Sequence, residues 1–105
     1  MSQQELPEHL RLQIRTALTH YAKFYAHLVS DNASDAEHEL RLIGEVDKRI
    51  RAKESNLSFQ AYHRKRTQLM RIFRSQLIKT IEGQVQEEIL KKAEGLIGKL
   101  EIEEI

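Results

Sequence analysis

The stretch from Phe59 to Ile81 carries a group of cations, and the wider span that starts at Ser55 contains no Asp or Glu. The cations are Arg64, Lys65, Arg66, Arg71, Arg74 and Lys79. Guanidinium and ammonium groups neutralise phosphates, and the Gln, Ser and Thr side chains between them can donate further hydrogen bonds. Two expectations follow for this stretch: it binds an anionic partner, first of all the backbone of DNA or RNA, or it is a solvated charged face without a ligand.

The basic charge is confined to the middle of the chain. Residues 1–40 hold three Lys or Arg and six Asp or Glu, residues 41–79 hold eleven and three, and residues 80–105 hold three and seven. Two interpretations stay open, because the acidic flanks can pair with the basic centre inside one bundle, or the centre can face an acidic partner, either nucleic acid or a protein. The residues predicted to contact nucleic acid are Arg41, Lys48, Arg49, Arg64, Lys65, Arg71, Arg74 and Lys79.

Helices are the elements that would position these cations. Apolar residues recur every three or four positions after Pro7, which predicts a helix over residues 7–30. The spacing of Ser34 and Glu37 is that of a capping box and predicts a second helix over about 35–54. Lysines and arginines crowd the end of this second helix, where cations complement the helix dipole, so part of the central charge also has a structural explanation.

A third helix is expected over about 58–100, with Ser58 as its N-cap. Its apolar residues recur every four positions, at Leu69, Phe73, Leu77, Ile81, Val85, Ile89, Ala93 and Ile97. Because a step of four overshoots a helical turn by about 40°, this stripe winds around the helix. Either the helix breaks or bends near Gly83, or one long helix buries different faces along its length.

The end of the chain has the apolar spacing of a short coiled coil, which predicts a homodimer. The residues expected at that oligomer interface are Val85, Ile89, Ala93, Leu96, Ile97 and Leu100. The alternative is a fourth helix that folds back onto the same chain.

The fold class expected from these elements is all-α. The prediction is one domain over residues 1–105, a three-helix bundle-like domain with a long C-terminal helix, either straight or bent near Gly83, that dimerises. The residues expected on the core side of the third helix are Phe59, Tyr62, Leu69, Met70, Phe73 and Leu77. Arg66 points towards that side, so we expect it at the edge of the core or paired there.

Several kinds of chemistry lack the residues they need. The chain contains no Cys, and it shows no Gly-rich phosphate loop and no Ser-His-Asp order. Its five histidines form no pair at metal-ligand spacing, so we expect no metal and no cofactor. No run approaches the roughly 18 apolar residues of a membrane span, and a cytoplasmic protein that is not an enzyme is the expectation.

Two local patterns resemble known families. The spacing from Arg15 to His20 resembles the Arg-x4–6-His core of the HEPN ribonucleases, which implies RNA cleavage, although Thr16 departs from that family's preference. The segment around Leu57 and Ser58 resembles the recognition helix of LuxR-type regulators, although the preceding helix lacks the apolar residues of that motif.

Three classes of function follow from these observations. The favoured one is a small, oligomeric, non-enzymatic helical protein that binds nucleic acid through its basic helix face. The alternative is a protein–protein adaptor, or a subunit of a larger complex, that acts through its C-terminal aliphatic helix. A HEPN-like ribonuclease is the third.

Overall fold

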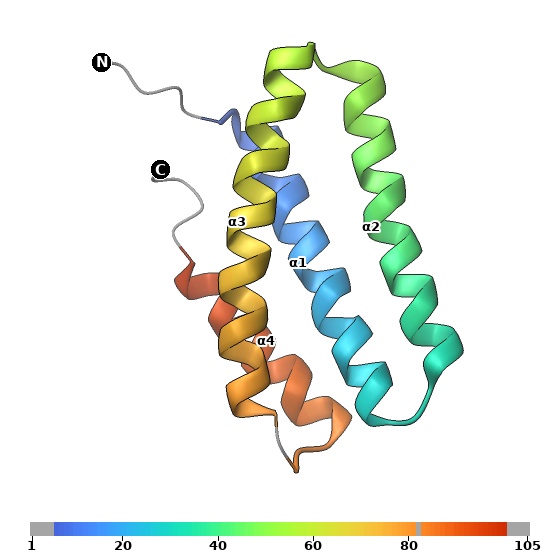
Figure 1. Ribbon diagram of the computed structural model, residues 1–105. Coiled ribbons are helices and arrows are strands. Elements are labelled where there is room, and N and C mark those ends of the chain that lie inside the picture. Colours follow the sequence, from blue (N-terminus) through green and yellow to red (C-terminus); the bar gives the residue numbers. More distant parts are fainter. Residues whose placement is uncertain (1–5, 82, 101–105) are drawn as a thin grey trace.

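The computed structural model describes residues 6–81 and 83–100 and folds them into helices, as expected for an all-α protein. The helices are α1 (Glu8–Val29), α2 (Ala33–Lys53), α3 (Asn56–Thr80) and α4 (Gln86–Lys99). α1 packs against each of the other three, and α3 and α4 also pack against each other (Figure 1). No helix in the described part of the chain is long and apolar enough to cross a membrane.

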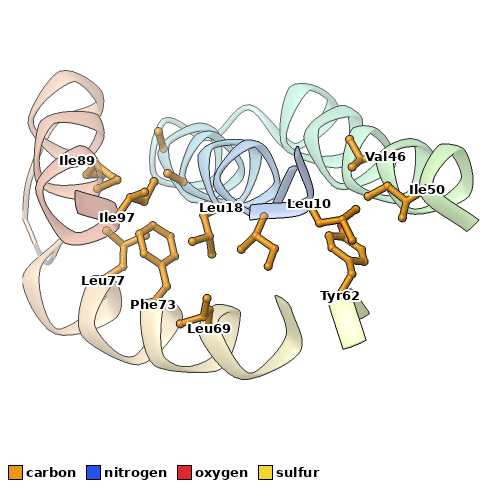
Figure 2. Close-up of a cluster of buried hydrophobic side chains, with 14 of the residues drawn as sticks. Leu10, Leu18, Val46, Ile50, Tyr62, Leu69, Phe73, Leu77, Ile89 and Ile97 are labelled. Carbon is orange, nitrogen blue, oxygen red and sulfur yellow. The ribbon is translucent and has the colours of Figure 1, made fainter. Parts of the chain in front are cut away.

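The core runs the length of α1. At one end Tyr62 of α3 lies with Leu10 and Ile50, and at the other Phe73 and Leu77 meet the isoleucines of α4 (Figure 2). Burying a large apolar side chain contributes about 1.5–3 kcal/mol, so this cluster accounts for the packing of four helices in so short a chain. The core side predicted for α3 is confirmed, except that Met70 is only half-buried.

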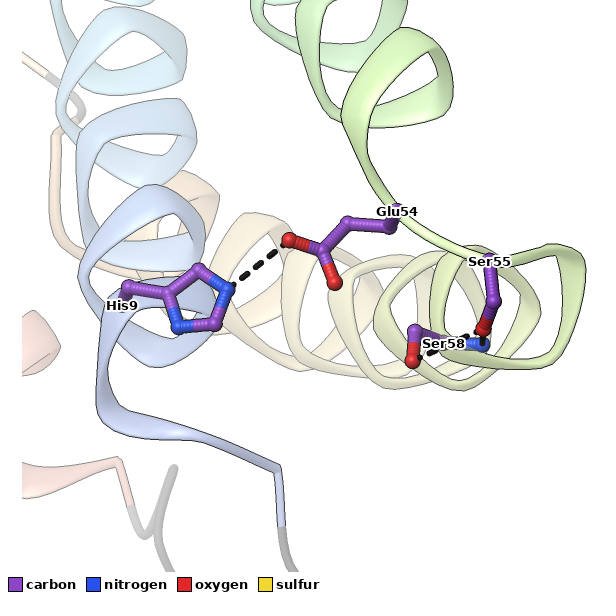
Figure 3. Close-up of polar contacts among 4 residues, drawn as sticks. All are labelled: His9, Glu54, Ser55 and Ser58. Carbon is purple, nitrogen blue, oxygen red and sulfur yellow. Dashed lines mark hydrogen bonds and ion pairs between the residues drawn. The ribbon is translucent and has the colours of Figure 1, made fainter.

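The N-caps of α2 and α3 differ from the sequence expectation. Asn32 caps α2 by accepting a hydrogen bond from the N–H of Asp35, and Ser55 caps α3 by accepting one from the N–H of Ser58 at 3.1 Å (Figure 3). Ser34 and Ser58 therefore lie inside the first turns and are not N-caps. In both cases a polar residue before the expected cap already has a non-helical backbone and can take that role, so each helix starts a few residues earlier.

The helix expected over 58–100 is two helices, which is the broken form of the two considered. The chain leaves α3 after Thr80, and Gly83 adopts a φ of 74°, a left-handed conformation that glycine tolerates without a Cβ clash. This turn lets α4 run back along α1, as the picture shows (Figure 1). The described residues thus form four helices, and the expected three-helix arrangement with one long C-terminal helix is corrected.

The folding back of α4 changes the availability of the predicted oligomer interface. Ile89, Ala93 and Ile97 lie in the core of the single chain, with 0%, 1% and 8% of their surface exposed. Val85 is exposed, whereas Leu96 and Leu100 are half-buried beside the core. Half of the predicted interface is therefore committed within one chain, and association of two chains stays a prediction.

Candidate nucleic-acid interface

α3 presents two different polar surfaces, and the inner one is centred on Asp47 of α2. The Tyr62 hydroxyl donates a hydrogen bond to one carboxylate oxygen of Asp47, and the Arg66 guanidinium donates to the other, both at 2.8 Å. Burial, reinforced by the hydrogen bond to Asp47, raises the pKa of Tyr62 well above its ordinary value. Arg66 is thus paired at the edge of the core, as its position on the helix indicated, and its charge is used to join α3 to α2.

The outer surface of α3 is an open hollow of about 810 Å³ beside the end of α2. Three arginines line it: Arg51 from the last turn of α2, and Arg64 and Arg71 from α3. The other lining side chains are Asn56, Phe59, Gln60, His63, Thr67 and Gln68, so no carboxylate faces the hollow. We call this surface the basic hollow.

Helix geometry and one aromatic ring hold the arginines in place. Arg64 and Arg71 are seven residues apart, so they lie on the same side of α3 about two turns from each other. Arg51 is fixed from the other helix, because its guanidinium lies 4.4 Å from the centre of the Phe59 ring in a cation–π contact. The His63 ring lies 5.7 Å from the same phenyl ring.

The chemistry of the basic hollow is that of an anion site. Guanidinium groups offer several N–H donors in a planar fork that matches phosphate oxygens. The neutral amide and hydroxyl groups between them add donors without repelling an anion.

The residues of α3 that were predicted to contact nucleic acid occupy different surroundings in the structure. Arg64 and Arg71 line the basic hollow. Arg74 lies exposed one turn further on, where its Nε donates a hydrogen bond to the Tyr25 hydroxyl at 2.8 Å. Lys79 is exposed in the last turn, and Lys65 is buried, with 5% of its surface exposed. Lys65 is therefore not placed to contact a large ligand.

The predicted residues on α2 do not join the basic hollow. Arg41 is paired with Glu37 on the exposed side of the helix, at 3.2 Å. Arg49 lines a small pocket between α2 and α1, and Lys48 is exposed. The sequence analysis did not predict that Arg51 and His63 line the basic hollow. Arg51 was assigned to the helix dipole, and only the geometry of the turn between α2 and α3 brings it over Phe59.

The two family resemblances meet different surroundings in the structure. His20 lies against Glu39 of α2, with its Nδ1 at 2.7 Å from the carboxylate, and both side chains are largely buried. The helix-turn-helix pattern requires Leu57 to pack in an apolar contact, but its side chain is 78% exposed. His20 therefore joins two helices in this fold, and the recognition-helix pattern lacks the buried contact that it requires at Leu57.

Comparison with known proteins found no match to this chain among protein-family models, curated proteins or solved structures. Within the described residues, no group of three or more His, Asp or Glu side chains is placed to hold a metal ion. The candidate site thus stands on its own geometry.

Proposed function

We propose that the protein binds nucleic acid through the basic hollow. The observation that carries the proposal is the absence of any carboxylate among side chains that include three arginines and four neutral hydrogen-bond donors. In a chain with nearly equal numbers of acidic and basic residues, a surface of one sign needs an explanation. A polyanion with regularly spaced phosphates supplies one, because each arginine can neutralise a phosphate and release a counterion.

Two acidic residues of α2 have their partners outside the basic hollow. Asp47 is engaged by Tyr62 and Arg66, and Glu39 is engaged by His20. Arg66 and Arg41 of the basic centre do pair with carboxylates of α2, but no acidic side chain lines the basic hollow, so its three arginines are not neutralised there. The alternative of an adaptor acting through α4 draws less support, because the apolar residues of that helix largely pack inside the chain.

The test is a charge reversal with a matched control. The double substitution Arg64→Glu with Arg71→Glu should abolish retardation of DNA and RNA in gel shifts at low salt, because it reverses two of the three cations of the basic hollow. The control is Arg49→Glu with Lys79→Glu, which makes the same change in net charge outside the hollow and should weaken binding far less.

Two results would end the proposal. One is a wild-type protein that retards neither DNA nor RNA at low salt. The other is an equal loss of binding in the two double variants, because that would assign the effect to net charge alone. Circular dichroism of each variant confirms that the helices persist.

A further inference from the structure

A cluster of aromatic side chains on α1 lies beside the basic face of α3. The rings of Tyr21 and Phe24 are nearly parallel, with centres 5.8 Å apart, and Tyr25 meets both edge-on at 5.3 and 5.0 Å. All three side chains keep part of their surface in solvent. We call these three residues the aromatic cluster.

The aromatic cluster is joined to the basic face through Arg74. The Arg74 Nε donates to the Tyr25 hydroxyl at 2.8 Å, and the guanidinium is exposed. Arg74 follows Arg71 by three residues, which places it within one turn of the last arginine of the basic hollow. The cations of α3 therefore continue from the hollow to the edge of the aromatic cluster.

Phe24 differs from the two tyrosines of the cluster in its packing. Tyr21 and Tyr25 pack against the main core, whereas Phe24 does not belong to that set among the described residues. Tyr21 contacts Phe73 of α3 at 6.4 Å and so has a structural role. Phe24 instead stacks on Tyr21 and stays partly exposed, so part of its ring is accessible to a partner.

One acidic residue of α2, Glu39, lies against α1 next to the aromatic cluster. Glu39 binds His20, the residue before Tyr21. The contacts of α2 with Tyr62 and Arg66 lie eight residues further along α2, at Asp47, which is about 12 Å along the helix axis. The aromatic cluster thus lies well away from the place where α2 and α3 are joined by hydrogen bonds.

We propose that the preferred ligand is single-stranded nucleic acid, whose phosphates lie along the arginines of α3 while a base stacks on Phe24. This inference rests on the proposed function and adds the form of the nucleic acid. A base in a duplex is stacked on its neighbours and is closed to a protein ring, whereas an unpaired base offers its whole face. Arginine rows beside an accessible aromatic ring are the combination that single-strand binding requires.

The experiment compares two probes and three proteins. The probes are a fluorescein-labelled oligothymidylate of about 12 nucleotides, within the range of known single-strand site sizes, and a duplex of the same length. The proteins are the wild type, Phe24→Leu, which keeps an apolar side chain and removes the ring, and Phe24→Trp, which keeps a stacking surface. Affinity is read from fluorescence anisotropy at low salt.

The expected result has three parts. The wild type binds the single strand more tightly than the duplex. Phe24→Leu binds the single strand about tenfold more weakly and leaves duplex affinity unchanged, since stacking of one base accounts for a change of that order. Phe24→Trp retains single-strand affinity, and its emission is quenched by the oligothymidylate; the wild-type chain contains no Trp, so this signal belongs to position 24.

Other results separate the two proposals. If the duplex binds as well as the single strand and Phe24→Leu changes neither affinity, the single-strand inference is wrong while nucleic-acid binding stands. If neither probe binds at low salt, both proposals fail, and binding of polyglutamate by the wild type would then identify an acidic protein as the partner. Circular dichroism and urea unfolding of Phe24→Leu show whether the helices persist; a loss of affinity for both probes by a folded variant also contradicts the inference.

Discussion

The two faces of α3 use the same residue type for opposite purposes. Arg66 on the inner face has 9% of its surface exposed and is bound to Asp47, whereas Arg64, two residues earlier, is exposed and lines the basic hollow. The sequence places both in one run of three cations. The difference shows that a count of basic residues overstates the charge available to a ligand, because the angle around the helix decides which cations serve the fold.

The largest expected difference is between the effects of substituting Arg66 and Arg64 on the free energy of unfolding. Arg66→Ala should lower the free energy of unfolding by about 3 kcal/mol, the lower end of the cost of breaking a buried ion pair. The lower end applies because the Asp47 side chain keeps 22% of its surface exposed. Arg64→Ala should change the free energy of unfolding by less than about 0.5 kcal/mol, as for ordinary surface positions. Urea unfolding measures both, and equal costs would remove the distinction between the two faces.

A smaller difference is expected between two tyrosine hydroxyls. Tyr62→Phe removes a buried hydrogen bond to Asp47 and should cost about 1 kcal/mol. Tyr25→Phe removes an exposed hydrogen bond from Arg74 and should cost less than about 0.5 kcal/mol. The same urea titration decides this, and a Tyr25→Phe variant less stable than Tyr62→Phe would show that the outer contact is the structural one.

The pH dependence of stability gives a third test of the inner face. Burial raises the pKa of Tyr21 to about 12, and that of Tyr62 is raised as well, so both phenols ionise more readily in the unfolded chain. The stability that the two neutral phenols contribute is fully present below their pKa in the unfolded chain, about 10. It is lost as the pH rises through their pKa values in the folded protein. Stability should therefore fall above about pH 10.

The Tyr62→Phe variant provides the matched control for that titration. Its stability should fall less steeply than that of the wild type, by up to about 1.4 kcal/mol per pH unit, because one fewer proton is released on unfolding. Unfolding by urea at a series of alkaline pH values measures the two slopes. Parallel curves would contradict the assignment of Tyr62 to a buried site.

The sequence predicted the parts of the fold that depend on local pattern. α1 ends within one residue of the expected position, and five of the six residues expected on the core side of α3 are buried. The break at Gly83 was left open, because a spacing of four is compatible with a bent helix or with two helices. The choice depends on whether α4 can bury its isoleucines against α1, which is a tertiary question.

The candidate site was predictable only where it lies on one helix. The spacing of Arg64 and Arg71 was enough to place them together. Arg51 comes from another helix, and its contact with Phe59 depends on the turn between α2 and α3. The burial of Lys65 depends on how other parts of the chain cover its side of α3, which a pattern within one helix does not report.

The most direct test of the account is the salt dependence of oligothymidylate binding. With three arginines in the basic hollow and Arg74 beside it, the logarithm of the association constant should fall against the logarithm of salt concentration with a slope between about −2 and −3. Arg64→Ala and Arg71→Ala should each make the slope shallower by about 0.7, whereas Arg49→Ala should leave it unchanged. A slope near zero, or an equal change in all three variants, would contradict the claim that the basic hollow binds phosphates.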